Sequence, residues 1–118
     1  IAEVKESAYL VEMSNLEIVG SRFVGENETI VKTAARESLD LIKKLVSGEF
    51  NGEKIITLGP MPSRVAKVNG KFRYRLIIKC RNSKRFRQMI SKTLIQMGTD
   101  SRFSKVTVFA DMNPDSAI

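Results

Sequence analysis

One stretch of the chain concentrates positive charge without any negative side chain. Residues 64 to 92 hold eleven of the twenty Lys and Arg residues and no Asp or Glu, whereas residues 1 to 50 hold nine acids and six bases. Such a block attracts polyanions, and arginine offers paired donors to phosphate or carboxylate. A solvated basic face is the alternative, but a purely structural segment usually contains interspersed acids. We therefore expect a surface that binds nucleic acid or an acidic protein tail.

The sharpest pattern within this stretch is Phe72-Arg73-Tyr74-Arg75. Along a strand from 72 to 79, side chains alternate between the two faces of a sheet, so Arg73, Arg75 and Lys79 would share one face. Phe72 and Tyr74 would then point into the core, which argues against base stacking by these rings. The nucleic-acid-binding residues predicted from the stretch are Arg64, Lys67, Lys71, Arg73, Arg75, Lys79 and Arg81.

A small apolar patch is expected beside these arginines. Ile77 lies on the arginine face by alternation, and the pattern of the last strand places Phe109 there as well. Such a patch, rimmed by cations, would also suit a peptide that ends in a carboxylate with an aromatic residue nearby.

The residues that usually carry catalysis are missing. The chain has no histidine, and Gly48, Gly52 and Lys54 do not have the spacing of a phosphate-binding loop. Cys80 is the only cysteine, so we read it as a small apolar residue rather than part of a disulfide or zinc site. We expect a non-catalytic chain without a metal or cofactor of its own.

The spacing of apolar residues predicts an α+β fold. Glu28 to Val46 shows helical periodicity, with Ile30 and Val31 on the inward face and Asn27 as the N-cap. A second helix would begin after a cap at Asn82 or Ser83, and the rest reads as strands and turns. The order is strand, helix, strand, strand, helix, strand, which is the split βαβ arrangement of ferredoxin-like domains, with both helices on one sheet face. The predicted strand segments span residues 16–24, 55–58, 64–68, 72–79 and 105–111, which is one more segment than the four strands of that arrangement.

Glycines and prolines mark the expected irregularities. Gly20 would form a bulge in the first strand, and Pro60 and Pro62 require the strand at 55–58 to stop or to lie at an edge. Asn69-Gly70 predicts a tight type I′ hairpin turn. Residues 1–14 form a lead-in with a weak helical stripe, and residues 15–118 form a single domain. The chain begins with Ile1 rather than Met, which suggests a piece of a longer protein or a processed product.

Several of these motifs resemble a known family. Gly59-Pro60-Met61-Pro62-Ser63, the strand Phe72-Arg73-Tyr74-Arg75 with Leu76-Ile77-Ile78-Lys79 after it, and the ending Asp111-Met112-Asn113-Pro114 resemble the C-terminal domain of the bacterial primosomal replication-restart helicase, PriA. The resemblance covers roughly residues 15–116. It implies a fold similar to that of a small ribosomal-subunit protein.

The resemblance also implies a function and partners. The parent protein would be an ATP-dependent DNA helicase of the bacterial cytoplasm, with its ATP, Mg and Zn sites outside this chain. The domain would bind forked or single-stranded DNA and other primosome proteins. It would also help to bind the acidic tail of single-strand-binding protein. By position, the resemblance assigns this contact to Ser83, Lys84 and Arg87.

Two other functions fit the residues. A ribosomal or other structured-RNA-binding module would use the same fold and basicity. A pure protein-interaction domain would use its basic face only for acidic partners. No apolar run is long enough to cross a bilayer, so we expect no membrane partner.

Overall fold

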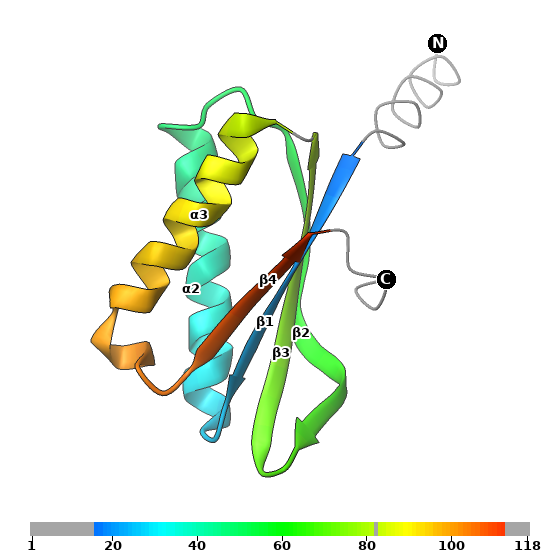
Figure 1. The fold of residues 1–118 in the computed structure, drawn as a ribbon, viewed down its shortest axis with the longest axis vertical. Coiled ribbons are helices and arrows are strands. Elements are labelled where there is room, and N and C mark those ends of the chain that lie inside the picture. Colours follow the sequence, from blue (N-terminus) through cyan, green and yellow to red (C-terminus); the bar gives the residue numbers. More distant parts are fainter. Residues whose placement is uncertain (1–15, 82, 113–118) are drawn as a thin grey trace.

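A computed structural model of the chain describes residues 16–81 and 83–112, so the predicted lead-in at 1–14 and the alternative cap Asn82 lie outside the described residues. The described residues form four strands, two α-helices and one short 3₁₀ helix, and Figure 1 shows how the strands and α-helices are arranged. The elements in chain order are β1 (Leu16–Gly25), α2 (Glu28–Ser47), β2 (Ile55–Val68), β3 (Lys71–Arg81), α3 (Lys84–Thr99), η1 (Ser101–Phe103) and β4 (Thr107–Met112).

The strands form one sheet in the order β2-β3-β1-β4, and every neighbouring pair is antiparallel. Both α-helices cover the same face of this sheet, as Figure 1 shows. The α+β prediction and the split βαβ arrangement are therefore confirmed. The opposite sheet face carries no helix among the described residues.

The core lies between the sheet and the helices. Tyr74, Leu76 and Ile78 of β3 are buried there, as the alternation predicted. They pack in one cluster with Phe23 of β1 and Phe86 of α3. Burial of each large apolar side chain contributes about 1.5–3 kcal/mol. This packing fixes which side chains of the strands face away from the helices.

The two α-helices begin at polar caps. Asn27 accepts a hydrogen bond from the Ile30 backbone N–H at 3.1 Å, as predicted for this cap. The predicted inward position of Ile30 is wrong, because this residue lies in the first turn of α2 and is 37% exposed. Ser38 and Leu39 are buried further along the helix.

β2 differs most from the prediction. It continues through Gly59 and Pro62, where the sequence suggested two separate strands, and it lies at the edge of the sheet. Its register against β3 shifts between Leu58 and Met61 and again between Pro62 and Lys67, and β2 bends outward in this part of Figure 1. An edge strand can accommodate proline because its outer N–H groups need no partner strand.

Glycine is required at the first of these shifts. Gly59 has φ 100° and precedes the cis-Pro60 peptide, and a Cβ there would come within 2.9 Å of the Arg75 carbonyl oxygen. The bulge predicted at Gly20 is wrong, because the β1–β3 register runs without a shift from Leu16 to Gly25. The hairpin turn is confirmed by the positive φ of both Asn69 (52°) and Gly70 (76°).

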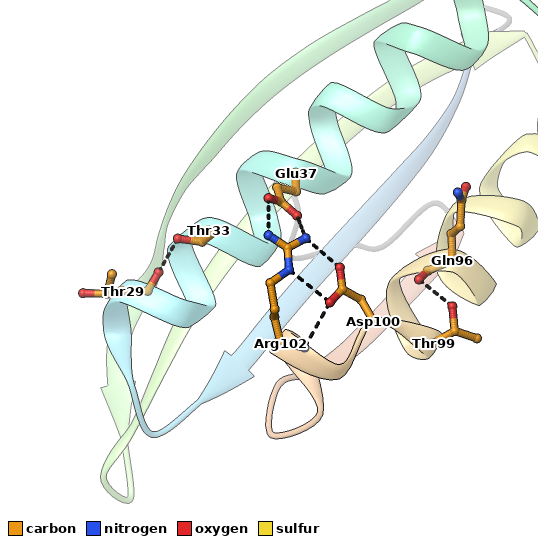
Figure 2. Close-up of polar contacts among 7 residues, drawn as sticks. All are labelled: Thr29, Thr33, Glu37, Gln96, Thr99, Asp100 and Arg102. Atoms are coloured by element: carbon orange, nitrogen blue, oxygen red, sulfur yellow. Dashed lines mark hydrogen bonds and ion pairs between the residues drawn. The ribbon is translucent and has the colours of Figure 1, made fainter.

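An ion-pair cluster joins η1 to α2 (Figure 2). Arg102 donates to both carboxylate oxygens of Glu37, at 2.9 and 2.5 Å, and to those of Asp100, at 3.1 and 2.6 Å. Hydrogen bonds from the Arg102 side chain and backbone lower the pKa of Asp100, and the same carboxylate raises the pKa of Arg102. The cluster fixes the connection between α3 and β4.

Candidate nucleic-acid interface

The sheet face without helices carries the arginines predicted to bind nucleic acid. Arg73, Arg75 and Lys79 alternate with the core residues of β3 and are half-buried. Among residues 16–81 and 83–112, no ion pair involves any of these three side chains. We call the surface of the sheet that faces away from the helices the open face.

Arg22 adds a further cation to the open face that sequence reasoning missed. It lies directly opposite Arg75 on one side and Phe109 on the other. Its Nη2 atom donates to Asp111 at 3.2 Å, and its guanidinium lies 5.2 Å from the centre of the Phe109 ring. The signal was present in the sequence, because Phe23 points into the core and its neighbour in the strand must point outward.

The Arg22 and Arg75 side chains leave hydrogen-bonding capacity unused. The Nε atoms of both are buried and have no hydrogen-bond partner among the described residues. Like charges placed directly across two strands repel each other, and Asp111 offsets only part of that charge. An anion bound beside the two guanidinium groups would relieve this repulsion.

Apolar side chains lie beside these cations, but the patch differs from the predicted pair of Ile77 and Phe109 because Ile77 is buried. Phe109 of β4 and Leu58 of β2 are each 44% exposed. Ile77 lies directly opposite Leu58 of β2 and Gly20 of β1, and it is only 4% exposed, yet it does not belong to the core cluster. The open face therefore combines arginines with exposed apolar surface.

The remaining predicted cations extend away from this centre. Arg64 is exposed in the bulged part of β2, and the Lys67 ammonium lies 5.0 Å from the centre of the Phe72 ring. Lys71 and Arg81 are exposed at the two ends of β3, about 33 Å apart at the usual rise of a strand. The seven predicted residues are thus spread along β2 and β3 rather than gathered in one cluster, and Lys67 lies on the helix side of the sheet with Phe72.

The residues assigned to protein docking differ in their availability. The Ser83 hydroxyl is the N-cap of α3: it accepts a hydrogen bond from the Phe86 N–H at 3.0 Å and donates to Glu53 at 3.3 Å. Lys84 and Arg87 are exposed, and the first turn of α3 contains no acid. Cations at the positive end of a helix raise the local potential further. Lys84 and Arg87 fit an acidic ligand, whereas Ser83 has a structural role.

The outer face of α3 is less available than its basic sequence suggested. Arg85 donates to the backbone carbonyl oxygens of Asn51 and Glu49 at 3.1 and 2.9 Å, and it lies 5.7 Å from the Phe50 ring centre. Lys92 forms an ion pair with the Glu49 carboxylate. These two cations therefore attach α3 to the loop between α2 and β2.

The described residues offer little for other chemistry. Cys80 is fully buried, as expected for a small apolar residue, and its Sγ lies 3.6 Å from Oε2 of Glu53. Residues 16–81 and 83–112 contain no group of three or more His, Cys, Asp or Glu side chains that could hold a metal ion. None of the helices in this part of the chain is both long and apolar enough to cross a membrane.

Solved structures support the fold alone. The de novo designed protein Foldit4 is 15% identical with a TM-score of 0.57, over 85% of this chain and 98% of the design. A de novo designed protein with a ferredoxin fold is 11% identical with a TM-score of 0.57, over 85% of this chain and 86% of the design. A hydantoinase/carbamoylase family amidase from Burkholderia ambifaria is 11% identical with a TM-score of 0.57. The match covers 82% of this chain but 27% of the amidase.

The sequence comparisons identify a family. No curated protein matches the chain. The family model of the primosomal protein N C-terminal domain matches residues 17–115, which include all the described strands and helices. The chain therefore belongs to the primosomal protein N C-terminal domain family.

Proposed function

We propose that this domain binds DNA and docks a protein tail within a replication-restart helicase. Membership of the primosomal protein N C-terminal domain family assigns it to replication restart by the primosome, and favours this role over the RNA-binding alternative. The observation that carries the proposal is the open face, where Arg22, Arg73, Arg75 and Lys79 lie together with Asp111 as the one carboxylate paired to them among the described residues. The DNA would be forked or single-stranded.

Binding of phosphates to the open face has a measurable salt dependence. Each phosphate contact contributes about 0.9 to the slope of log affinity against log salt on duplex DNA, and about 0.7 on single strands. Arg73→Ala with Arg75→Ala should weaken binding to fork DNA of any sequence. The slope of log affinity against log salt should become shallower by the contribution of about two phosphate contacts. Lys32→Ala with Arg36→Ala, on the exposed side of α2, is the control of equal charge. An unchanged slope in the β3 variant would remove the open face from the proposal.

The start of α3 is the proposed docking site for the acidic tail of single-strand-binding protein. Its support is the exposed pair Lys84 and Arg87 in a first turn without acids. A synthetic acidic peptide with an apolar last residue and a free carboxylate should shift the amide signals of residues 83–90, and the amidated peptide should not. A peptide that causes no saturable shifts would exclude this site.

Ser83 needs a separate control because it caps α3. Ser83→Ala should lower the free energy of unfolding by about 1 kcal/mol, whereas Asn is an equally good N-cap residue. Ser83→Asn is therefore the variant to compare with Arg87→Ala in peptide titrations. We expect Arg87→Ala to weaken peptide binding and Ser83→Asn to leave it nearly unchanged.

The rest of the proposed activity lies outside this chain. The parent protein would be an ATP-dependent helicase in the bacterial cytoplasm, where DNA is replicated. Its ATP, Mg and Zn sites, and its contacts with other primosome proteins, would belong to that larger protein. The role proposed for this domain is to hold DNA and the protein tail, without catalysis.

A further inference from the structure

Phe109 is an exposed aromatic side chain on a cationic sheet face. We infer that it is a stacking platform for an unpaired base, so that the open face is specific for single-stranded DNA. This inference rests on the proposed DNA binding and adds the strand type and the residue that selects it. Phe109 is 44% exposed on β4, directly opposite Arg22 in the sheet register.

No other aromatic ring in the described residues has this position. Tyr74 is buried in the core, and Phe72 is half-buried on the helix side of β3, where Lys67 contacts its ring. Phe23, Phe50, Phe86 and Phe103 are buried as well. Among the described residues, Phe109 is therefore the aromatic ring that the open face offers to a ligand, and it lies beside Arg22.

Arg22 and Asp111 order the platform before a ligand arrives. The Arg22 guanidinium lies 5.2 Å from the centre of the Phe109 ring and is held by Asp111 at 3.2 Å. Side chains that are already ordered lose less conformational entropy on binding. A nucleotide would therefore meet a ring and a guanidinium that are fixed relative to each other.

The neighbouring strands place phosphate-binding groups at suitable distances. Arg22 lies one strand from Phe109 and Arg75 lies two strands away, which is about 5 and 10 Å at the usual strand spacing. A base stacked on Phe109 would leave its flanking phosphates beside these cations. A basic surface with an aromatic ring is the usual arrangement for single-strand binding. Duplex bases are already stacked and cannot offer their faces to the ring.

The test compares three variants of the 118-residue chain with a thymidine oligonucleotide and a blunt duplex. Phe109→Ala should weaken single-strand binding about tenfold, and leave duplex binding and both salt slopes unchanged. Phe109→Leu keeps apolar area but removes the ring, so it should lose most of the same affinity. Ile95→Ala is the control, because Ile95 is an exposed apolar side chain of α3, outside the open face, and should change nothing.

A crosslink locates the contact directly. An oligonucleotide carrying 5-iodouracil should photocrosslink to the tryptic peptide that follows Lys105 and contains Phe109. The inference is overturned if Phe109→Ala binds the single strand as tightly as the wild type, or if it weakens single-strand and duplex binding equally. It is also overturned if that variant loses only the acidic peptide, which would make Phe109 a protein contact.

Failure of this inference can be told apart from failure of the proposed function. If Arg73→Ala with Arg75→Ala weakens DNA binding while Phe109→Ala does not, DNA binding stands and base stacking is excluded. If the wild-type chain shows no saturable, salt-dependent DNA binding, both are excluded.

Discussion

The two sides of the molecule use positive charge differently. On the helix side, Arg102 is held by two carboxylates, Arg85 by two backbone carbonyl oxygens and Lys92 by Glu49. On the sheet side, Arg73 and Arg75 have no carboxylate partner among the described residues. The first set of cations joins elements of the fold, whereas the second is available to a ligand. The number of basic residues in a stretch therefore does not measure its capacity to bind polyanions.

The largest expected effect comes from reversing charge on the open face. Arg22→Glu with Arg75→Glu removes two phosphate contacts, which corresponds to a loss of about 60-fold in duplex affinity near 0.1 M salt, and adds repulsion. Lys32→Glu with Arg36→Glu, on the exposed side of α2, should cost much less because salt screens distant charges. Fluorescence anisotropy with labelled fork DNA measures both. Equal losses would show that only net charge matters.

Arg85 tests whether the cations on the helix side stabilise the fold rather than bind a ligand. Arg85→Ala removes hydrogen bonds to two carbonyl oxygens and the contact with the Phe50 ring, so the free energy of unfolding should fall by about 1–2 kcal/mol. Urea denaturation gives this value. DNA affinity of the folded variant should stay within about twofold of wild type. A large loss of DNA affinity with unchanged stability would place Arg85 in the interface instead.

Asp111 tests how a carboxylate on the open face affects DNA binding. Its carboxylate pairs with Arg22 and repels any phosphate that approaches. Asp111→Asn should therefore strengthen DNA binding by a few-fold, with little change in stability because exposed ion pairs contribute little. The control is Glu37→Gln, which removes a carboxylate on the helix side and should not strengthen DNA binding. Weaker binding by Asp111→Asn would mean that ordering of Arg22 outweighs repulsion.

The smallest effect is a pH dependence at the Arg102 cluster. Arg102 lowers the pKa of Asp100 in the folded chain from its ordinary value of 3.8. The pair therefore stabilises the fold fully above that value, and this contribution is lost as the pH falls through the lower folded pKa. Urea midpoints of wild type and Asp100→Asn should converge as the pH is lowered from about 5 to about 2. A difference that stays constant over this range would exclude the linkage.

Local patterns in the sequence predicted the open face well. Alternation along β3 separated the arginines from the core residues, and Asn69-Gly70 marked the hairpin turn that fixes the register. These features depend on residues close together in the chain and on the fixed period of a strand. The same rule applied to β1 would have found Arg22.

Partners far apart in sequence could not be predicted. The attachment of Lys92 to Glu49 and of Arg85 to Asn51 follows from the packing of α3 on α2, which no local pattern encodes. The continuity of β2 was missed because Pro60 and Pro62 usually end a strand, and only its edge position permits them. The cap of α3, by contrast, was predicted at Asn82 or Ser83 from local sequence, and the Ser83 hydroxyl makes it.

An NMR titration of the labelled chain with a single-stranded oligonucleotide tests the central claim most directly. The account predicts saturable shift changes along residues 18–24, 73–79 and 107–111, in β1, β3 and β4, and little change along α2. Shift changes concentrated on the exposed sides of α2 and α3, with the open-face strands unaffected, would contradict it.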